Sequence, residues 1–136
     1  MNNNQFNKED FMKKSVGIIV GGKSVEHEVS IITGLQVFDN IDKAVYEPSI
    51  IYIQKDGRWY VGNSLHNIDN YKNKNFDDAY EVLPGFNNGK LKLYPHPEIK
   101  QGFFSKKHTT YEIDIVFPAV HGTNAEDGAL HGMFQM

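Results

Sequence analysis

The chain has 136 residues, the length of one domain with a substantial hydrophobic core. A hydrophobic content of 40%, a charged content of 23% and a net charge of -3 are ordinary for a globular protein and give no electrostatic reason to expect nucleic acid. The chain has no cysteines, which excludes disulfides, thiolate metal sites and cysteine nucleophiles, and we expect a cytoplasmic location. No apolar run approaches the length needed to span a membrane.

The first fourteen residues are polar and rich in asparagine, and they lack the apolar core of a signal peptide. We interpret residues 1–14 as a flexible leader and residues 15–136 as one domain. Met12, which is followed by two lysines, looks like a natural start. We therefore expect residues 1–11 to be an upstream extension.

The domain begins with a predicted strand, a glycine turn and a helix. Residues 16–20 are apolar and mostly β-branched, which is typical of a strand buried on both faces of a parallel sheet. Gly21 and Gly22 interrupt this run, and Ser24 is a natural N-cap for a helix that ends near Asn40. The apolar residues of that helix recur at helical spacing: Val25, Val29, Ile32, Leu35 and Phe38. Ligands bind at such turns in open α/β sheets.

Acidic residues after this turn indicate which ligand it would accept. Glu26 and Glu28 fall in the expected first helical turn, where their charge disfavours a phosphate. The two glycines lack the spacing of a dinucleotide fingerprint, and the Lys-Ser pair that follows lacks the spacing of a P-loop. Carboxylates at this position suit an ammonium group. The alternative is that they only complement the helix dipole.

A hairpin is predicted in the middle of the chain. Residues 45–54 have the pattern of a strand, and Asp56 with Gly57 turns the chain back on a short antiparallel partner. That partner contains Trp59, which we expect to pack in the core. Residues 62–78 are polar, and we interpret them as a loop with one short helix.

A second hairpin is predicted between residues 80–83 and 91–94, with Asn88 and Gly89 in its turn. Two phenylalanines and three basic residues then lie close together within residues 103–108. Such a cluster can bind single-stranded nucleic acid, but one short cluster in an acidic chain favours an ordinary loop.

The last third of the chain contains a second candidate functional residue. Residues 113–117 have the pattern of a buried strand, and His121 lies just beyond its carboxyl end. Residues 123–128 are rich in capping residues, and residues 129–136 begin a helix. The chain ends within this helix, so we expect it to be a fragment of a longer protein.

These elements predict an α/β fold with an open, mainly parallel sheet flanked by helices and an antiparallel hairpin insertion. If the first and last strands are neighbours, the loops that carry Glu26 and His121 meet at one edge of the sheet. A carboxylate beside a histidine donor forms a clamp for an amino acid. A structural role for His121 is the alternative, and a zinc site of His27, His121 and Glu126 is less favoured because no pair has diagnostic ligand spacing.

Two segments resemble the N-terminal domain of D-alanine-D-alanine ligases, which has a Rossmann-like, pre-ATP-grasp fold. They are GGKSVEHEVS at residues 21–30 and VFPAVHGTNAEDG at residues 116–128. The resemblance implies an ATP-grasp enzyme of bacterial peptidoglycan precursor synthesis, in which the first D-alanine becomes an acyl phosphate that the amine of the second attacks. It also implies that ATP and magnesium or manganese bind to two further domains absent from this chain, so we expect no cofactor or metal in the fragment and no activity from it alone.

The resemblance assigns roles to four residues. Glu26 matches the glutamate that contacts the ammonium group of the first D-alanine, and Val29 matches a valine of its methyl pocket. His121 matches the histidine near the carboxylate of that substrate, and Glu126 matches a glutamate that supports the site. Glu26 and His121 are therefore the expected catalytic residues. Three positions depart from the commonest family pattern, with other residues where arginine, glycine and glutamine are frequent: His27, Ala125 and His131.

Two alternatives remain open. The second substrate could be D-serine or D-lactate, because residues outside this chain select it, or the chain could be a non-catalytic, flavodoxin-like signalling module. The helix that begins near Asp127 leaves an apolar face without evident cover. We therefore expect it to dock on the missing ATP-grasp domains or to form a homodimer. Neither nucleic acid nor a membrane is an expected partner.

Overall fold

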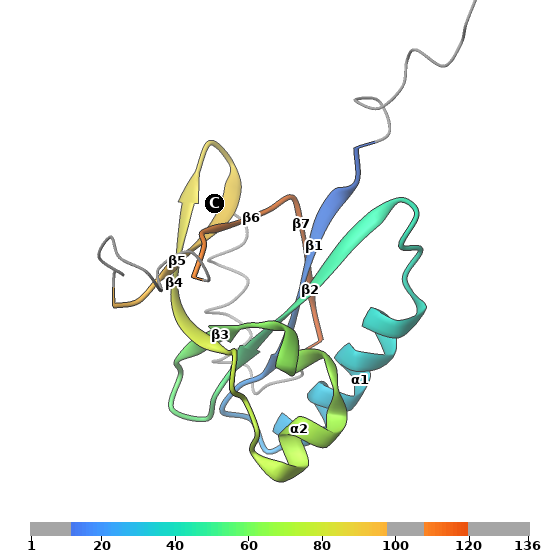
Figure 1. The fold of residues 1–136 in the computed structure, drawn as a ribbon, viewed down its shortest axis with the longest axis vertical. Coiled ribbons are helices and arrows are strands. Elements are labelled where there is room, and N and C mark those ends of the chain that lie inside the picture. Colours follow the sequence, from blue (N-terminus) through green and yellow to red (C-terminus); the bar gives the residue numbers. More distant parts are fainter. Residues whose placement is uncertain (1–11, 98–107, 120–136) are drawn as a thin grey trace, which may run out of the picture.

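A computed structural model describes residues 12–97 and 108–119 and confirms the α/β class (Figure 1). The described helices and strands are, in chain order, β1 (Lys14–Gly21), α1 (His27–Asn40), β2 (Tyr46–Ile53), β3 (Trp59–Val61), the 3-10 helix η2 (Asn63–His66), α2 (Ile68–Asn73), β4 (Tyr80–Asn87), β5 (Lys90–Pro95), β6 (Tyr111–Ile113) and β7 (Ile115–Pro118). The leader up to residue 11, the basic and aromatic cluster up to residue 107, and the turn and helix predicted after residue 122 lie outside the described residues.

The described strands form one mixed sheet in the order β6-β5-β4-β3-β2-β1-β7. Strand β1 pairs in parallel with β2 and with β7, while the pairs from β2 to β6 are antiparallel. The antiparallel part is larger than we expected, so this sheet is mixed and not mainly parallel. Both predicted hairpin turns form, because Gly57 and the pair Asn88 and Gly89 adopt the positive φ angles that tight hairpins require.

The predicted strand at residues 113–117 is in fact two strands, and this was the main error in the predicted elements. Strands β6 and β7 lie at opposite ends of the sheet order, although only Asp114 separates them in the sequence. The backbone N–H of Asp114 donates to the Ser15 carbonyl at 3.1 Å and to Ser15 Oγ at 2.8 Å. The sheet therefore curls until both ends reach the start of β1. Strand β7 is also less buried than predicted, with Ile115 and Phe117 each 42% exposed.

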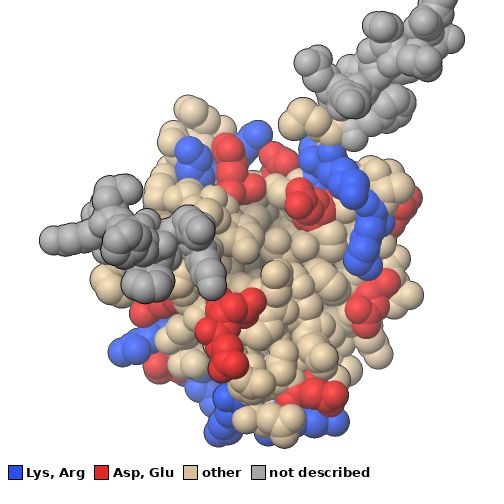
Figure 2. Space-filling view, in the orientation of Figure 1, with Lys and Arg blue, Asp and Glu red and all other residues tan. Residues whose placement is uncertain are grey.

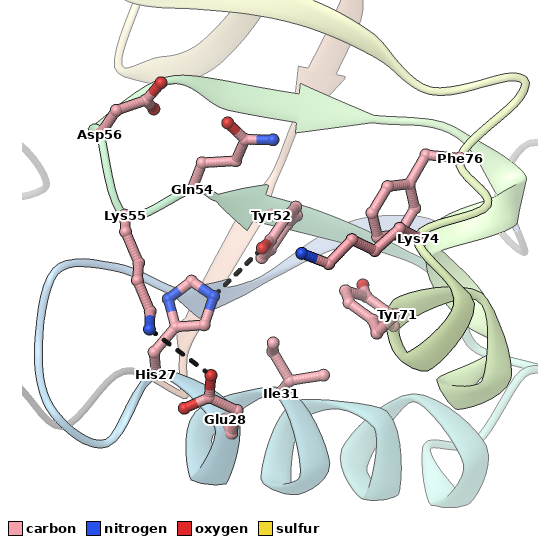
Figure 3. Close-up of a pocket in the computed structure, with 10 residues that line it drawn as sticks. All are labelled: His27, Glu28, Ile31, Tyr52, Gln54, Lys55, Asp56, Tyr71, Lys74 and Phe76. Atoms are coloured by element: carbon pink, nitrogen blue, oxygen red, sulfur yellow. Dashed lines mark hydrogen bonds and ion pairs between the residues drawn. The ribbon is translucent and has the colours of Figure 1, made fainter.

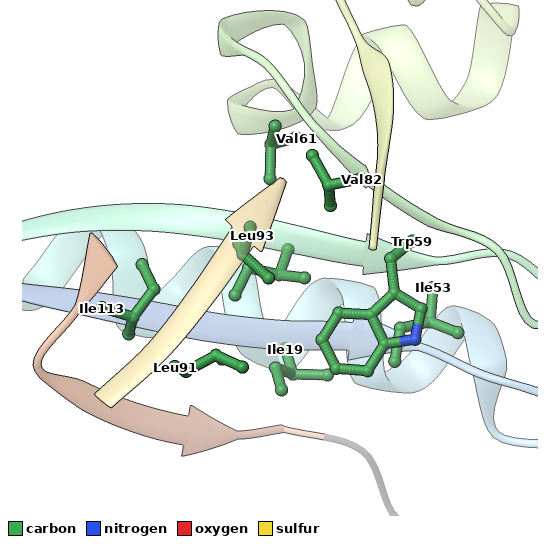
Figure 4. Packing of buried hydrophobic residues seen from close by; sticks show 9 residues of the cluster. Ile19, Ile53, Trp59, Val61, Val82, Leu91, Leu93 and Ile113 are labelled. Carbon is green, nitrogen blue, oxygen red and sulfur yellow. The ribbon is translucent and has the colours of Figure 1, made fainter. Parts of the chain in front are cut away.

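The curled sheet has a hydrophobic core on each face. Strand β1 serves both cores, because Ile19 points into the curl while Ile18 and Val20 point toward the helices. Trp59 packs inside the curl, as predicted (Figure 4). The inner core consists of Ile19, Ile51, Ile53, Trp59, Val61, Val82, Leu91, Leu93 and Ile113. The core under the helices consists of Val16, Ile18, Val20, Ile31, Leu35, Ile50, Leu65 and Ala119.

Helix α1 ends at Asn40 as predicted, but it begins later and buries a different face. Glu26 is the N-cap residue, and Ser24 instead closes the preceding turn by accepting a hydrogen bond from the Glu26 N–H at 2.9 Å. The buried residues of α1 are His27, Ser30, Ile31, Gly34 and Leu35. Three residues of the predicted apolar stripe are exposed: Val25, Val29 and Ile32.

The packing of α1 on β1 explains this difference. A Cβ added at Gly34 would lie 2.1 Å from Val20 Cγ1, so the helix approaches the strand where its side chains are smallest. Larger apolar side chains on that face would hold the helix away from the sheet. Within the described residues, no helix has the length and apolar character needed to cross a lipid bilayer.

Candidate functional site

The glycine turn fixes the geometry between β1 and α1. Gly21 and Gly22 have φ angles of 91° and 96°, which favour glycine. The Gly22 N–H donates to the Ile53 carbonyl at 2.7 Å, and a Cβ at Gly21 would lie 2.2 Å from the same oxygen. Ser30 Oγ accepts from the Gly21 N–H at 2.7 Å and donates to the His27 carbonyl at 2.8 Å. The turn is thus tied to the end of β2 and to the first turn of α1.

Glu26 and Val29 lie three residues apart at the start of α1, a spacing that makes them neighbours on the helix surface. Both side chains are exposed, Val29 by 53%. The Glu26 carboxylate has no hydrogen bond or ion pair with any residue in the described part of the chain.

The structure separates Glu26 from Glu28, although the sequence suggested that both carboxylates could hold one ammonium group. Glu28 Oε2 lies 3.6 Å from Lys55 Nζ, and both side chains are largely exposed. Its own backbone hydrogen bond, and then the Lys55 charge, hold the pKa of Glu28 below its usual value. Glu28 is already paired with a cation, so Glu26 is the better candidate.

The second predicted loop follows a strand that lies directly beside β1. Strand β7 pairs with β1 in parallel, with Ile19 opposite Pro118, so the carboxyl ends of the two strands share one edge of the sheet. The Ala119 N–H donates to the Ile19 carbonyl at 2.8 Å. The condition for the two loops to meet, that the first and last strands are neighbours, is therefore fulfilled up to Ala119. His121 and Glu126 lie outside the described residues, and their positions stay predictions.

A hollow of about 500 Å³ lies between α1, the end of β2 and the segment around α2 (Figure 3). Tyr71 contacts Tyr52 and Phe76 edge-on, each with ring centroids 5.3 Å apart, and these aromatic rings form one wall. Charged side chains of both signs surround the opening. The hollow is lined by His27, Glu28, Ile31, Tyr52, Gln54, Lys55, Asp56, Tyr71, Lys74 and Phe76.

The tyrosines of this hollow are hydrogen-bond donors at physiological pH. Burial, and then the negative charges of Glu28 and Asp56, raise the pKa of Tyr52. Burial also raises the pKa of Tyr71, whose hydroxyl donates to the Leu65 carbonyl at 2.7 Å. Both hydroxyls therefore keep their protons well above neutral pH.

His27 connects this hollow to the glycine turn. Its ring is only 4% exposed, with Nδ1 hydrogen-bonded to the Gly22 carbonyl and Nε2 lying 3.1 Å from the Tyr52 hydroxyl. Both nitrogens are thus in use within the protein, which argues against the zinc site that included His27. Residues 12–97 and 108–119 contain no group of three histidine or acidic side chains placed to hold a metal ion.

Comparison with known proteins decides the family. A family model described as the N-terminus of D-ala D-ala ligase matches residues 15–136. The chain belongs to this family of ligase N-terminal domains.

Curated proteins and solved structures agree with the D-alanine-D-alanine ligase family. The chain is 38% identical over 126 residues to the D-alanine-D-alanine ligase of Oceanobacillus iheyensis, covering 92% of this chain and 33% of the relative. It is 40% identical over 128 residues to that of Shouchella clausii, covering 91% of this chain and 33% of the relative. The chain therefore spans about a third of the length of these relatives.

Two solved structures share the fold of this D-alanine-D-alanine ligase N-terminal domain. The D-alanine-D-alanine ligase from Coxiella burnetii matches with a TM-score of 0.66 and 30% identity, over 90% of this chain and 33% of that one. The VanG D-Ala:D-Ser ligase from Enterococcus faecalis matches with a TM-score of 0.66 and 26% identity, over 91% of this chain and 34% of that one. The resemblance of the two sequence segments to this family is confirmed.

The sequence of this ligase N-terminal domain did not predict the hollow or the connection through His27. The aromatic wall comes partly from Tyr71 and Phe76, which lie in the polar stretch that we interpreted as a loop with one short helix. The helix is confirmed as α2, but the spacing of the two aromatic residues within that stretch was the signal that we overlooked. Of the residues to which the resemblance assigned roles, Glu26 and Val29 are described, and neither lines the hollow.

Proposed function

We propose that this chain is the domain that binds the first substrate of an ATP-dependent ligase that joins two D-alanines. The observation that carries the proposal is the family match over residues 15–136, together with curated relatives named D-alanine-D-alanine ligase. In the proposed reaction ATP phosphorylates the carboxylate of the first D-alanine. The amine of the second D-alanine then attacks the acyl phosphate, so that an amide bond forms and phosphate leaves. The dipeptide would serve peptidoglycan precursor synthesis.

The ATP and the Mg²⁺ or Mn²⁺ of this reaction are assigned to parts of the protein outside this chain. The described residues offer no group of ligands for a metal ion, and the acidic start of α1 is a poor place for phosphates. The chain covers only a third of the relatives' length, which leaves room for such domains. The reaction belongs in the cytoplasm, where ATP is supplied.

The proposed role of Glu26 is to bind the ammonium group of the first D-alanine. The exposed carboxylate has no described protein partner, and an ammonium group would give it charge-assisted hydrogen bonds. Val29, the neighbouring apolar residue on the helix surface, would contact the methyl group. Together they would distinguish the amine and side-chain ends of a small amino acid.

The proposed role of His121 is to donate a hydrogen bond to the carboxylate of the same substrate. Negative charge develops there during phosphoryl and acyl transfer, and a positioned donor stabilises it. Glu126 would support this histidine. The direct pairing of β7 with β1 supports the assignment, because it brings the end of β7 to the edge of the sheet that carries the glycine turn.

The proposal includes two kinds of partner: the ATP-grasp domains of the same protein and a second copy of the chain. Val25, which lies just before α1, and Ile32 on α1 are 95% and 51% exposed, so we assign these two apolar residues to contact with the ATP-grasp domains. A homodimer remains part of the proposal. Acidic and basic side chains are interspersed over the described face in Figure 2, and a large basic surface of the kind that binds nucleic acid is absent from that face.

D-serine as the second substrate is the competing proposal, because the VanG relative is named a D-Ala:D-Ser ligase. The full-length protein that contains this chain is incubated with ATP, Mg²⁺ and D-alanine, alone or with D-serine or D-lactate. We expect phosphate release and D-alanyl-D-alanine from D-alanine alone. Product that appears only with D-serine or D-lactate would move the protein to another ligase of the family. Absence of any product would contradict the ligase proposal.

A further inference from the structure

The buried imidazole of His27 lies directly next to the proposed ammonium-binding residue in the sequence. Its ring is enclosed between the glycine turn and Tyr52, which it contacts edge-on with ring centroids 5.5 Å apart (Figure 3). It is a buried titratable side chain to which the proposed reaction gives no task.

The hydrogen bonds of His27 define where its proton lies. The Gly22 carbonyl can only accept, so His27 Nδ1 must carry a proton and donate it. In the neutral ring, Nε2 is then an acceptor for the Tyr52 hydroxyl, 3.1 Å away. Tyr52 keeps the proton that it donates, because burial and nearby carboxylates raise its pKa. The Tyr52 hydroxyl, the His27 ring and the Gly22 carbonyl thus form a continuous series of hydrogen bonds from β2 to the glycine turn.

These hydrogen bonds hold the glycine turn through the Gly22 carbonyl, in addition to the backbone hydrogen bond that the Gly22 N–H makes. The Gly22 N–H is bound to the Ile53 carbonyl at 2.7 Å, and the Gly22 carbonyl is bound to His27. Gly22 therefore has both polar groups fixed at a φ angle of 96°. The backbone enters α1 four residues later at Glu26, whose carboxylate has no partner among the described residues. The direction of that carboxylate depends on how the turn is held.

We propose that His27 and Tyr52 are positioning residues that aim the Glu26 carboxylate at the ammonium group of the first D-alanine. The inference rests on the proposed function, because it needs Glu26 to bind that ammonium group. Side chains that bind a substrate must be held to about 0.5 Å by neighbours whose own conformations are locked. A buried ring with two hydrogen bonds meets this condition, whereas the exposed Glu26 side chain does not.

The test uses the full-length protein, with initial rates measured over a wide range of D-alanine concentrations and fitted with separate KM values for the two D-alanines. His27→Leu removes both hydrogen bonds, while His27→Asn keeps a donor near the position of Nδ1. We expect His27→Leu to raise the KM for the first D-alanine about tenfold with a smaller change in kcat. His27→Asn should recover most of that loss.

Two tyrosine variants form a matched pair of hydroxyl deletions within the same aromatic cluster. Tyr52→Phe removes the hydrogen bond to His27 and is expected to raise the same KM by roughly threefold. Tyr71→Phe keeps the ring that contacts Tyr52 and removes a hydroxyl that donates to the Leu65 carbonyl and, among the described residues, makes no hydrogen bond to the turn, so the KM should stay unchanged. This pair also carries the test if His27→Leu does not fold. Equal KM values for the two variants would overturn the inference.

A double mutant separates positioning from a general structural role. If His27 acts through Glu26, adding His27→Leu to Glu26→Gln should change the KM for the first D-alanine by less than about twofold. Independent, multiplying effects would overturn the inference and leave the proposed function standing. A wild-type protein that joins no D-alanine would overturn the proposed function and the inference with it.

Discussion

The Asp114 carboxylate accepts a hydrogen bond at 2.9 Å from the backbone N–H of Ser15, 99 residues earlier in the chain. Asp114 is the single residue between β6 and β7, which stand at opposite ends of the sheet order. Its carboxylate also lies 3.0 Å from Lys90 Nζ at the start of β5. Asp114 therefore joins both ends of the curled sheet to β1, the strand that leads into the glycine turn.

We expect Asp114→Ala to destabilise the domain by about 1–2 kcal/mol, because it removes the hydrogen bonds between this carboxylate and Ser15. The measurement is the midpoint and slope of urea unfolding. Asp39→Ala, which removes an exposed carboxylate on α1, is the matched control and should change stability by less than about 0.5 kcal/mol. Equal stability of the Asp114 variant and the wild type would contradict the role of this carboxylate in closing the sheet.

Acid should weaken the same contact. The Ser15 backbone hydrogen bond, and then Lys90, lower the pKa of Asp114 from its ordinary value. A carboxyl with a lowered folded-state pKa stabilises the fold above its unfolded pKa of about 3.9, and that stability is lost as the pH falls through the folded value. We expect Asp114→Asn to show a smaller loss of stability than the wild type between about pH 5 and pH 2. Identical pH profiles for the two proteins would contradict this assignment.

Gly34→Ala should destabilise the domain, although alanine normally stabilises a helix relative to glycine by roughly 1 kcal/mol. The new Cβ would lie 2.1 Å from Val20 Cγ1, so α1 must move away from β1 at a cost of about 1–3 kcal/mol. Thermal unfolding measures the difference, with Gln36→Ala on the exposed side of α1 as the control. A higher Tm for Gly34→Ala would mean that the helix and strand are less closely packed.

Strand β1 and the two hairpin turns were predictable from the sequence because their signals are local. The apolar run in β1 and the asparagine and glycine residues at the hairpin turns determine their own backbone geometry. The buried face of α1 was not predictable in the same way. Its contact with β1 includes Ser30, which is hydrogen-bonded to Gly21, and Gly34, whose small size matters only once Val20 is opposite it. Helical spacing of apolar residues therefore identified Leu35 correctly but also included the exposed Val25, Val29 and Ile32.

The site could be predicted only in part, because several of its contacts join residues from separate elements. The residues alone offered Glu26 and Glu28 as carboxylates for an ammonium group, and the family resemblance selected Glu26. The pairing of Glu28 with Lys55 depends on the segment that follows β2. The break at Asp114 was not predicted, because alternation of one aspartate with apolar residues also fits a single strand. Its hydrogen bonds go to Ser15 near the other end of the chain. The link from His27 to Tyr52 is likewise a contact between separate elements. Such contacts leave no periodic signal in the sequence.

The central claim is that Glu26 binds the ammonium group of the first D-alanine, and Glu26→Gln tests it most directly. The substitution keeps the shape of the side chain and removes its charge. The full-length variant is assayed for D-alanyl-D-alanine formation beside Glu47→Gln, which changes an exposed glutamate on β2. We predict that Glu26→Gln lowers kcat/KM at least about tenfold, equivalent to roughly 1.4 kcal/mol, while Glu47→Gln matches the wild type. An active wild type with an equally active Glu26→Gln variant would contradict the assignment of the site.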